Sequence, residues 1–193
     1  MNNQEFESLK RIFFKNSKEE LDNTYKNGLF DYLKSIEELG RYSIIAGYFQ
    51  YIKKGGSILD IGCGEGLLQN RLGESFSKYI GIDLSKEAID KAQKQSNDKV
   101  EFCVADMNTY SPIEKFDAIV FNEAMYYTSN HLNFLKKYAS FLNDGGIFIT
   151  SNFEVQNNRI HWSEIETVFP KYDETKVVNS KGTTWICKVL MSK

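Results

Sequence analysis

From Ser57 onward, short apolar runs alternate with helical patterns, and this alternation constrains the fold more than any other feature of the chain. The strand-like runs are Ser57–Ile61, Tyr79–Ile82, Val100–Val104, Phe116–Phe121 and Ile147–Thr150. The helical patterns between and after them cover Leu67–Phe76, Ser85–Gln95 and Asn130–Leu142. Strands that alternate with helices build a parallel sheet that is covered by helices on both faces. The sequence therefore predicts an α/β fold.

The carboxyl-terminal part departs from this alternation. A helical pattern over 160–169 is followed by two strand-like runs, Thr175–Val178 and Thr183–Leu190, with Asn179-Ser-Lys-Gly182 between them. That turn composition is typical of a hairpin. The predicted sheet therefore has seven strands, mostly parallel, with an antiparallel strand contributed by the terminal hairpin.

The first 56 residues read instead as helices that are rich in aromatic side chains. Apolar residues recur there at helical spacing: Phe6, Leu9, Phe13 and Phe14. Ser17-Lys-Glu-Glu20 has the form of a capping box, and another helical pattern covers 29–52, with Gly40 as a candidate break. We expect a single domain, in which residues 1–56 form a helical lid packed on an α/β core of 57–193.

The sharpest local motif is Ile58-Leu-Asp-Ile-Gly-Cys-Gly-Glu-Gly66, an apolar strand that runs into glycines at alternate positions. Such glycines let the backbone turn tightly and approach a ligand, and the helix that follows aims its free N–H groups at that ligand. A dinucleotide fingerprint needs glycine where this chain has Leu67. Asp60 would repel a pyrophosphate but would favour an ammonium group. The motif therefore argues against a nicotinamide enzyme and for a cationic or zwitterionic ligand.

Two further acids follow the next two predicted strands. Asp83, in Gly81-Ile-Asp-Leu-Ser85, ends the second strand, where its carboxylate can accept hydrogen bonds from both hydroxyls of a ribose. Asp106, in Val104-Ala-Asp-Met107, follows the third strand and can accept from an adenine amino group, although a plain surface acid is the alternative. Open α/β sheets bind ligands at the carboxyl ends of their strands. We therefore expect a nucleoside to bind between these acids and the glycine loop.

In this order, the motifs resemble those of the class I S-adenosylmethionine-dependent methyltransferases over about residues 40–190. The resemblance rests on I-L-D-I-G-C-G-E-G, G-I-D-L-S, A-D-M and F-D-A-I-V-F-N-E, followed by a glycine turn and the terminal hairpin. It implies a Rossmann-like, doubly wound sheet, with S-adenosyl-L-methionine as the cofactor and methyl donor.

The resemblance also implies which residues hold the donor. In that family, the position of Asp83 binds the ribose, that of Asp106 binds the adenine, and those of Asp60, Gly62 and Gly64 surround the methionine part. The predicted donor site also includes residues that lie beside these motifs or before the first strand: Arg41, Cys63, Leu84, Met107 and Asn122. Arg41 is placed where related enzymes contact the donor's carboxylate, and a solvated helix arginine is the alternative. Cys63 is expected to act as a small loop residue and not as a nucleophile.

Phe121-Asn-Glu-Ala-Met-Tyr-Tyr127 follows the fourth strand and is expected to lie nearest the transferred methyl group. Family members that methylate planar amines of nucleic acids or proteins often carry N-P-P-Y or D-P-P-Y here, and this chain lacks those prolines. The stretch instead resembles a small-molecule branch that includes the nodulation-type N-methyltransferases. Tyr126 and Tyr127 either wall the acceptor pocket, where they could face the sulfonium, or belong to the core.

Glu123 and His131 are the predicted catalytic residues. Glu123 is expected to act as a base or to anchor an amine, and a capping or loop acid is the alternative. His131 qualifies because imidazole titrates near neutrality, and a surface histidine at the start of a helix is the alternative. With two histidines far apart in the sequence and no acid cluster nearby, no metal site is expected.

Charge and composition bear on the acceptor and the compartment. The 193 residues carry 24 basic and 26 acidic side chains, so the net charge of −2 offers no electrostatic footprint for nucleic acid or an anionic membrane. The amino terminus lacks the layout of a secretion signal, and the 3 cysteines are too few for a disulfide framework. We therefore expect a cytoplasmic methyltransferase that modifies nitrogen or oxygen of a small molecule. An RNA or protein methyltransferase, or an inactive donor-binding scaffold, remains the alternative, and the oligomeric state stays open.

Overall fold

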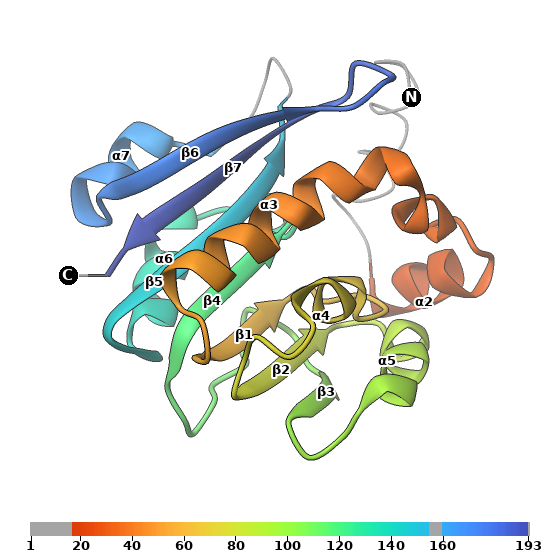
Figure 1. The fold of residues 1–193 in the computed structure, drawn as a ribbon. Coiled ribbons are helices and arrows are strands. Elements are labelled where there is room, and N and C mark those ends of the chain that lie inside the picture. The colour runs from red at the N-terminus through yellow and green to blue at the C-terminus, as the bar shows by residue number, and fades with distance from the viewer. Residues whose placement is uncertain (1–16, 155–159, 193) are drawn as a thin grey trace.

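A computed structural model of the chain describes residues 17–154 and 160–192, so the predicted helical pattern over Phe6–Phe14 lies outside the described residues. Seven strands form one sheet in the order β3-β2-β1-β4-β5-β7-β6 (Figure 1). Their bounds are β1 Ser57–Ile61, β2 Lys78–Asp83, β3 Val100–Val104, β4 Phe116–Asn122, β5 Leu142–Phe153, β6 Lys171–Val178 and β7 Thr184–Met191. In the described part, β7 pairs antiparallel with both of its neighbours, and all other adjacent strands pair parallel. The predicted seven-stranded α/β sheet with its terminal hairpin is confirmed.

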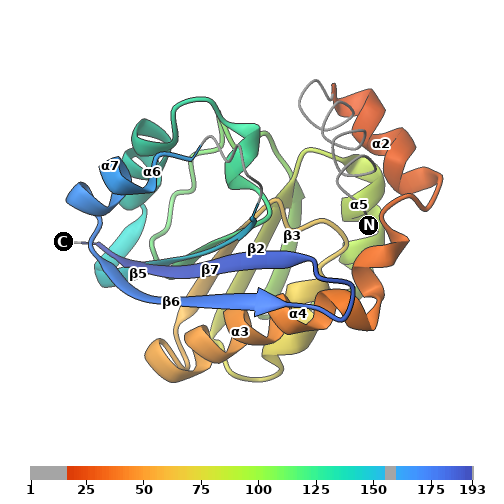
Figure 2. The ribbon, with the colours of Figure 1, turned by 90° about the horizontal axis from the view of Figure 1, so that it is seen from above.

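Helices lie on both faces of this sheet (Figures 1 and 2). The helices are α2 Lys18–Lys26, α3 Ile36–Ile52, α4 Leu67–Leu72, α5 Lys86–Ala92, α6 His131–Ala139 and α7 Trp162–Val168, with short 3-10 turns η1 Asp31–Lys34, η2 Gln93–Gln95 and η3 Met125–Tyr127. One apolar cluster packs α3, α4 and α5 against the sheet, and a second packs α6 and α7 against the other face. Because both faces are covered, the central strands are apolar almost throughout, as parallel strands usually are.

Two predicted helix starts are present as the sequence indicates. Ser17 caps α2 in a complete capping box, because its hydroxyl accepts from the Glu20 amide while the Glu20 carboxylate accepts from the Ser17 amide. Ser85 caps α5 by accepting from the amide of Ala88. Each cap satisfies backbone donors that the first turn of a helix leaves free.

The helical pattern predicted over 29–52 is interrupted at a different residue from the predicted Gly40. The interruption falls at Ser35, between η1 and α3, and α3 runs through Gly40 without a break. Gly40 serves packing instead, since a Cβ there would lie 2.9 Å from a methyl group of Val177 on β6. The small residue therefore lets the terminal hairpin approach α3.

Other boundaries also differ from those the sequence predicts. The helices predicted over Leu67–Phe76 and Asn130–Leu142 end early, at Leu72 and Ala139. Gly73 explains the first end, because its φ of 58° takes the chain out of the helix. β5 is longer than predicted and starts at Leu142, where an irregularity in its pairing with β4 absorbs the glycine turn at 143–146.

Phe121 on β4 is the centre of the core on the α6 side. Its side chain is fully buried, and its ring lies 5.4 Å from those of Phe134 and Tyr138 and 5.9 Å from that of Phe148. Replacing Phe121 with alanine is expected to lower the free energy of unfolding by about 3–5 kcal/mol, because a cavity replaces these contacts. Urea denaturation measures this change. Tyr51→Ala serves as the control, since Tyr51 is 87% exposed, and its loss should stay within about 0.5 kcal/mol.

Within residues 17–154 and 160–192, every helix falls short of the length and apolar character that crossing a membrane would require.

Candidate functional site

The glycine loop joins β1 to α4 at the carboxyl end of the sheet. Gly62, Gly64 and Gly66 all have positive φ values, of 74°, 54° and 76°, which side chains with a Cβ rarely adopt. The amides of Gly62 and Cys63 both donate to the Ile82 carbonyl of β2, at 2.8 and 2.9 Å. A Cβ on Gly62 would lie only 3.1 Å from that of Ala124, which follows β4. The loop thus lies between the ends of β2 and β4, where the sequence places it.

Asp83 fastens this loop to the end of β2. One carboxylate oxygen accepts from the Gly64 amide at 2.9 Å, and the other accepts from the Ser85 amide at 2.8 Å. Burial raises the pKa of the Asp83 carboxyl, and these backbone donors oppose the rise. A carboxylate has about four acceptor positions. Asp83 therefore keeps acceptor capacity for a ligand while it shapes the loop.

Asp60 lies on β1 beneath the loop and is 1% exposed. The Tyr79 hydroxyl donates to its Oδ2 at 2.5 Å, whereas its Oδ1 has no hydrogen-bond partner among the described residues. Burial raises the pKa of the Asp60 carboxyl to about 7, against the effect of the Tyr79 hydrogen bond. An unpartnered buried oxygen costs about 1–3 kcal/mol. A donor group on a ligand would remove this cost.

The residues predicted to contact the adenine ring of the donor lie on the loops after β2 and β3. Leu84 and Asp106 are both partly buried. The Oδ1 atom of Asp106 accepts from the amide and the side chain of Asn108, at 2.8 and 2.9 Å, which stabilises the turn after β3. The Met107 carbonyl accepts from the hydroxyl of Tyr138 at 2.8 Å, which ties the same turn to α6. A contact of these residues with adenine stays a prediction.

Helix α2, part of the segment expected to form a lid, contacts the glycine loop through Tyr25, a residue that no sequence motif singled out. The Tyr25 hydroxyl lies 2.8 Å from the position a Cβ on Gly64 would take. Asp22 accepts from the Ser85 hydroxyl at 2.6 Å, and Lys91 of α5 donates to the Tyr25 carbonyl at 2.9 Å. Figure 2 shows α2 beside α5. The segment before the first strand therefore closes over the part of the sheet where the sequence predicts the ligand.

Glu123 follows β4 in an uncommon backbone conformation. Its φ is 59°, the one positive value among the described residues other than glycine. Such backbone strain is concentrated at functional sites and costs on the order of 1–3 kcal/mol. The carboxylate accepts from the Ser151 hydroxyl and from the Phe153 amide, each at 3.2 Å. Burial raises the pKa of the Glu123 carboxyl to about 7, and the charge of Arg41 opposes this rise.

Arg41 is 1% exposed, so the alternative of a solvated helix arginine is wrong. Its Nε atom donates to Glu38 Oε2 at 2.9 Å, and its Nη1 donates to the side-chain oxygen of Asn122. The guanidinium carbon also lies 4.3 Å from the ring centre of Tyr42 and 5.8 Å from that of Trp185. Arg41 and Asn122 therefore contact each other beside Glu123. Their predicted contacts with the methyl donor stay predictions.

Tyr126 and Tyr127 belong to the 3-10 turn η3, which follows Glu123 in the sequence. Their ring centres lie 4.7 Å apart, and Tyr127 is 36% exposed, so the alternative that both belong to the core is wrong. Burial raises the pKa of each hydroxyl. The negative charge of Asp83 raises the pKa of Tyr127 further, and that of Glu123 raises the pKa of Tyr126 further. Glu123 acts on Tyr127 as well, so both tyrosines lie near Glu123, and Tyr127 also lies near Asp83.

His131 begins α6 and is 6% exposed, so the alternative of a surface histidine is wrong. Burial lowers the pKa of its imidazole, and the charge of His161 adds to the effect. The two histidines are therefore near each other in space, although they are far apart in the sequence. No hydrogen bond or ion pair joins His131 to Glu123 among the described residues. The described part of the chain also holds no group of three metal-ligating side chains.

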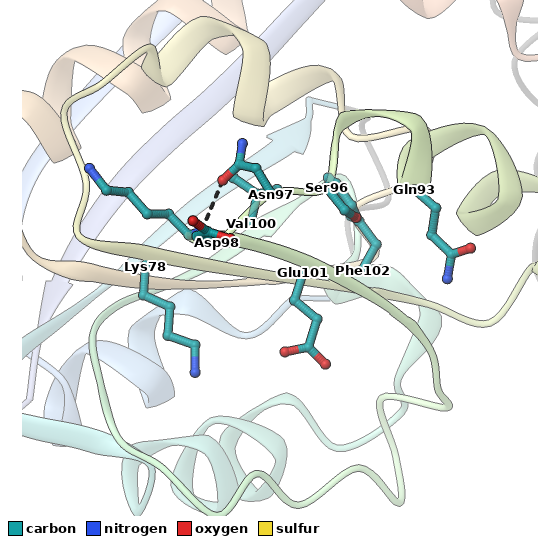
Figure 3. A pocket seen from close by; sticks show the side chains of 9 residues that line it. Lys78, Gln93, Ser96, Asn97, Asp98, Val100, Glu101 and Phe102 are labelled. Carbon is teal, nitrogen blue, oxygen red and sulfur yellow. Dashed lines mark hydrogen bonds between the residues drawn. The ribbon is translucent and has the colours of Figure 1, made fainter.

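A hollow lies away from this site, along the edge strand β3 (Figure 3). It is lined by residues from the start of β2, from η2, from the turn into β3 and from β3 itself, among them Lys78, Gln93, Asp98 and Glu101. These elements begin at the amino ends of the strands, opposite the glycine loop. The hollow therefore lies apart from the residues that the sequence motifs single out.

Comparison with known proteins identifies a family whose sequence model matches this chain. Residues 52–187 match the Methyltransferase domain family. A stretch of 101 residues, 50% of this chain, is 30% identical to malonyl-(acyl-carrier protein) O-methyltransferase 2 from Ilyobacter polytropus. The match covers 39% of that relative, so the chain spans about two fifths of its length.

Two solved structures are similar across nearly the whole fold. The N-methyltransferase NodS from Bradyrhizobium japonicum, in complex with S-adenosyl-L-homocysteine, aligns with a TM-score of 0.75 over 89% of this chain and 97% of its own. The 1,6-didemethyltoxoflavin-N1-methyltransferase from Burkholderia thailandensis aligns with a TM-score of 0.73 over 100% of this chain and 91% of its own. Each is 15% identical to this chain, so the likeness concerns the fold.

Proposed function

Because the chain belongs to the Methyltransferase domain family, we propose that it transfers a methyl group from S-adenosyl-L-methionine to nitrogen or oxygen of a small molecule. The observation that carries the proposal is the position of Asp83 against the glycine loop, with Glu123 and the tyrosine pair beside it. The two similar structures support a small acceptor, since both are named as N-methyltransferases and one is bound to 1,6-didemethyltoxoflavin.

The glycine-loop side has the chemistry that an adenosyl sulfonium needs. S-adenosyl-L-methionine, when bound, supplies an electrophilic methyl group. Asp83 would accept from the ribose hydroxyls, and the Oδ1 of Asp60, which has no partner among the described residues, would accept from the donor's ammonium. Gly62 and Gly64 leave room where a Cβ would crowd Ala124 or Tyr25. Asp106 with Met107 and Leu84 would border the adenine.

The Glu123 side would receive the acceptor. A carboxyl with a pKa of about 7 can accept a proton from an O–H or N–H group at neutral pH, and can also hold an amine. The tyrosines beside it offer apolar ring faces and hydroxyls that orient a small polar molecule. Alignment of the nucleophile and exclusion of water are the main tasks of such a site. We assign these tasks to Glu123, Tyr126 and Tyr127.

The helices before β1 would act as a lid on both ligands. Tyr25 lies over Gly64, so α2 must shift for a donor to reach the loop. Helix α2 is held to α5 by polar contacts of Asp22 and Lys91 and by a small apolar cluster of Tyr25, Phe30 and Ala88. This cluster is separate from the two clusters on the sheet, so a shift of α2 would leave the sheet intact. The lid would close again over the bound donor and exclude water.

The chain is proposed to work in the cytoplasm on a soluble acceptor, without nucleic acid or membrane. Its near-zero net charge supports this proposal, since binding to phosphate backbones relies on a basic surface. Cys63, Cys103 and Cys187 are all free thiols, which suits a reducing compartment.

Incubation with isotopically labelled S-adenosyl-L-methionine and a cell extract, followed by separation into metabolites, RNA and protein, tests the proposal. Mass spectrometry should detect a small molecule that has gained CH₂ and the label, together with S-adenosyl-L-homocysteine. Asp83→Ala protein in the same extract is the control and should form little of either product. Label that appears only in RNA or protein would contradict the small-molecule acceptor, and donor that remains intact in every fraction would contradict the activity.

A further inference from the structure

Helix α3 carries two buried charged residues, Glu38 and Arg41, which lie one helical turn apart. Glu38 is 7% exposed and Arg41 is 1% exposed. Their ion pair measures 2.9 Å between Glu38 Oε2 and Arg41 Nε. The guanidinium also donates a hydrogen bond through Nη1 to the side-chain oxygen of Asn122. Buried ion pairs are costly unless their geometry and hydrogen bonds compensate for lost hydration. A buried pair at this place therefore calls for an explanation beyond stability.

Glu123 lies next to this pair without joining it. Among the described residues, no ion pair connects Glu123 with a basic side chain, and its carboxylate accepts instead from two neutral donors, Ser151 and Phe153. Arg41 is nevertheless close to Glu123, because its Nη1 donates to the side chain of Asn122, the preceding residue, and its charge lowers the pKa of the Glu123 carboxyl. Two carboxyl groups thus share the neighbourhood of one guanidinium, and only Glu38 is paired with it.

Titratable groups from several elements surround Glu123. The titratable groups that face it are Arg41 and Glu38 from α3, Tyr32 from η1, Tyr126 and Tyr127 from η3, and Cys187 from β7. Arg41 is the one permanent cation in this described set. The protonation of Glu123 therefore depends on whether Arg41 is free to approach it.

We propose that Glu38 is a positioning residue, which keeps Arg41 engaged so that Glu123 retains a transferable proton. A guanidinium that is held by a fixed carboxylate has its charge largely neutralised for other neighbours. Without Glu38, Arg41 would be an uncompensated buried cation, and Glu123 is an acid on which its charge already acts. Glu123 would then be held ionised. The inference deepens the proposed function, because it explains how the acceptor's proton can move to Glu123 and leave again near neutral pH.

The test follows the ionisation of Glu123 itself and needs no acceptor. The full chain, labelled with ¹³C at glutamate carboxyl carbons, is titrated by NMR, and the Glu123 signal is assigned by its loss in Glu123→Gln. In wild type, its midpoint should lie near pH 7. In Glu38→Gln, the midpoint should fall by about one pH unit or more, which is the usual effect of an unshielded cation beside a carboxyl. Arg41→Gln should shift the midpoint upward.

The neighbouring glutamate supplies a matched control. Glu37 lies on the same helix but pairs with Lys181 of the terminal hairpin at 2.8 Å, so Glu37→Gln should leave the Glu123 midpoint unchanged. Glu38→Asp should restore part of the wild-type midpoint, and together with Arg41→Gln it decides the question if Glu38→Gln fails to fold. An unchanged or raised midpoint in Glu38→Gln would overturn the proposal.

The outcome also separates this inference from the proposed activity. If the midpoint falls as expected but no methyl transfer is found, the role of Glu38 stands and the activity does not. If methyl transfer is found and the midpoint does not move, the activity stands and Glu38 is only a structural partner of Arg41.

Discussion

Asp83→Ala is expected to weaken the binding of S-adenosyl-L-homocysteine by at least about tenfold, as measured by isothermal titration calorimetry. The expected contacts are hydrogen bonds from ribose hydroxyls to a charged carboxylate, which contribute about 1.5–3 kcal/mol each. Asp83 also holds Gly64 and Ser85 by their amides, so its loss should loosen the loop that receives the ligand. Both effects lower affinity, and far-ultraviolet circular dichroism should show that the fold is kept.

Two further variants make this result specific. Asp83→Asn keeps a hydrogen-bond acceptor of the same size, so it should lose less affinity than alanine does. Asp90→Ala removes a nearby acid on α5 that pairs with Lys86 on the surface, and its affinity should equal that of wild type. Wild-type affinity in Asp83→Ala would refute the ribose assignment.

Glu123→Gln is expected to reduce turnover by about 10²- to 10⁴-fold, the usual contribution of a general base, while donor affinity changes little. Glutamine keeps the shape, and its side-chain oxygen can accept from the Phe153 amide while its NH₂ group donates to the Ser151 hydroxyl oxygen, but it cannot take a proton. The measurement compares kcat with the calorimetric Kd for S-adenosyl-L-homocysteine, once the labelled-donor experiment has supplied the acceptor. Glu154→Gln is the matched control, because Glu154 lies just after β5 and pairs with Lys176 on the surface.

The pH dependence of turnover supplies a second signature of Glu123. A base works in its deprotonated form, so the wild-type rate should rise with pH and level off above the pKa of about 7. The residual rate of Glu123→Gln should lack this rise. Burial also raises the pKa of Asp60 to about 7. A rise that persists unchanged in Glu123→Gln would assign the titration to Asp60 and contradict the role of Glu123 as base.

The parts of the fold that the sequence predicts well are those that local chemistry decides. β1 and β3 have the predicted bounds because each is an apolar run closed by turn residues. Ser17 and Ser85 cap helices because a short hydroxyl side chain satisfies amides within its own turn. The glycine loop and Asp83 are likewise local, since the spacing along one strand-loop-helix unit fixes where they lie.

The features that the sequence does not predict depend on contacts between distant segments. Arg41 and Asn122 are 81 positions apart, and nothing local shows that α3 would bury the arginine against β4. Asp22 and Tyr25 occur on an ordinary polar helix. Their contacts with α5 and the glycine loop depend on the tertiary arrangement, which the local sequence does not reveal. His131 is buried because its helix faces a large apolar cluster. Sequence reasoning names Arg41 but misses Glu38, for which the available signal was an acid one helical turn before an arginine of the predicted site.

The structure of the chain with S-adenosyl-L-homocysteine bound tests the central claim most directly. We expect the ribose hydroxyls within hydrogen-bond distance of Asp83, the amino acid part beside the glycine loop, and Tyr25 moved away from Gly64. The thioether sulfur should point toward Glu123 and the tyrosine pair. If the ligand binds elsewhere and Tyr25 stays over Gly64 with Asp83 unengaged, the claim that this edge of the sheet holds a methyl donor is wrong.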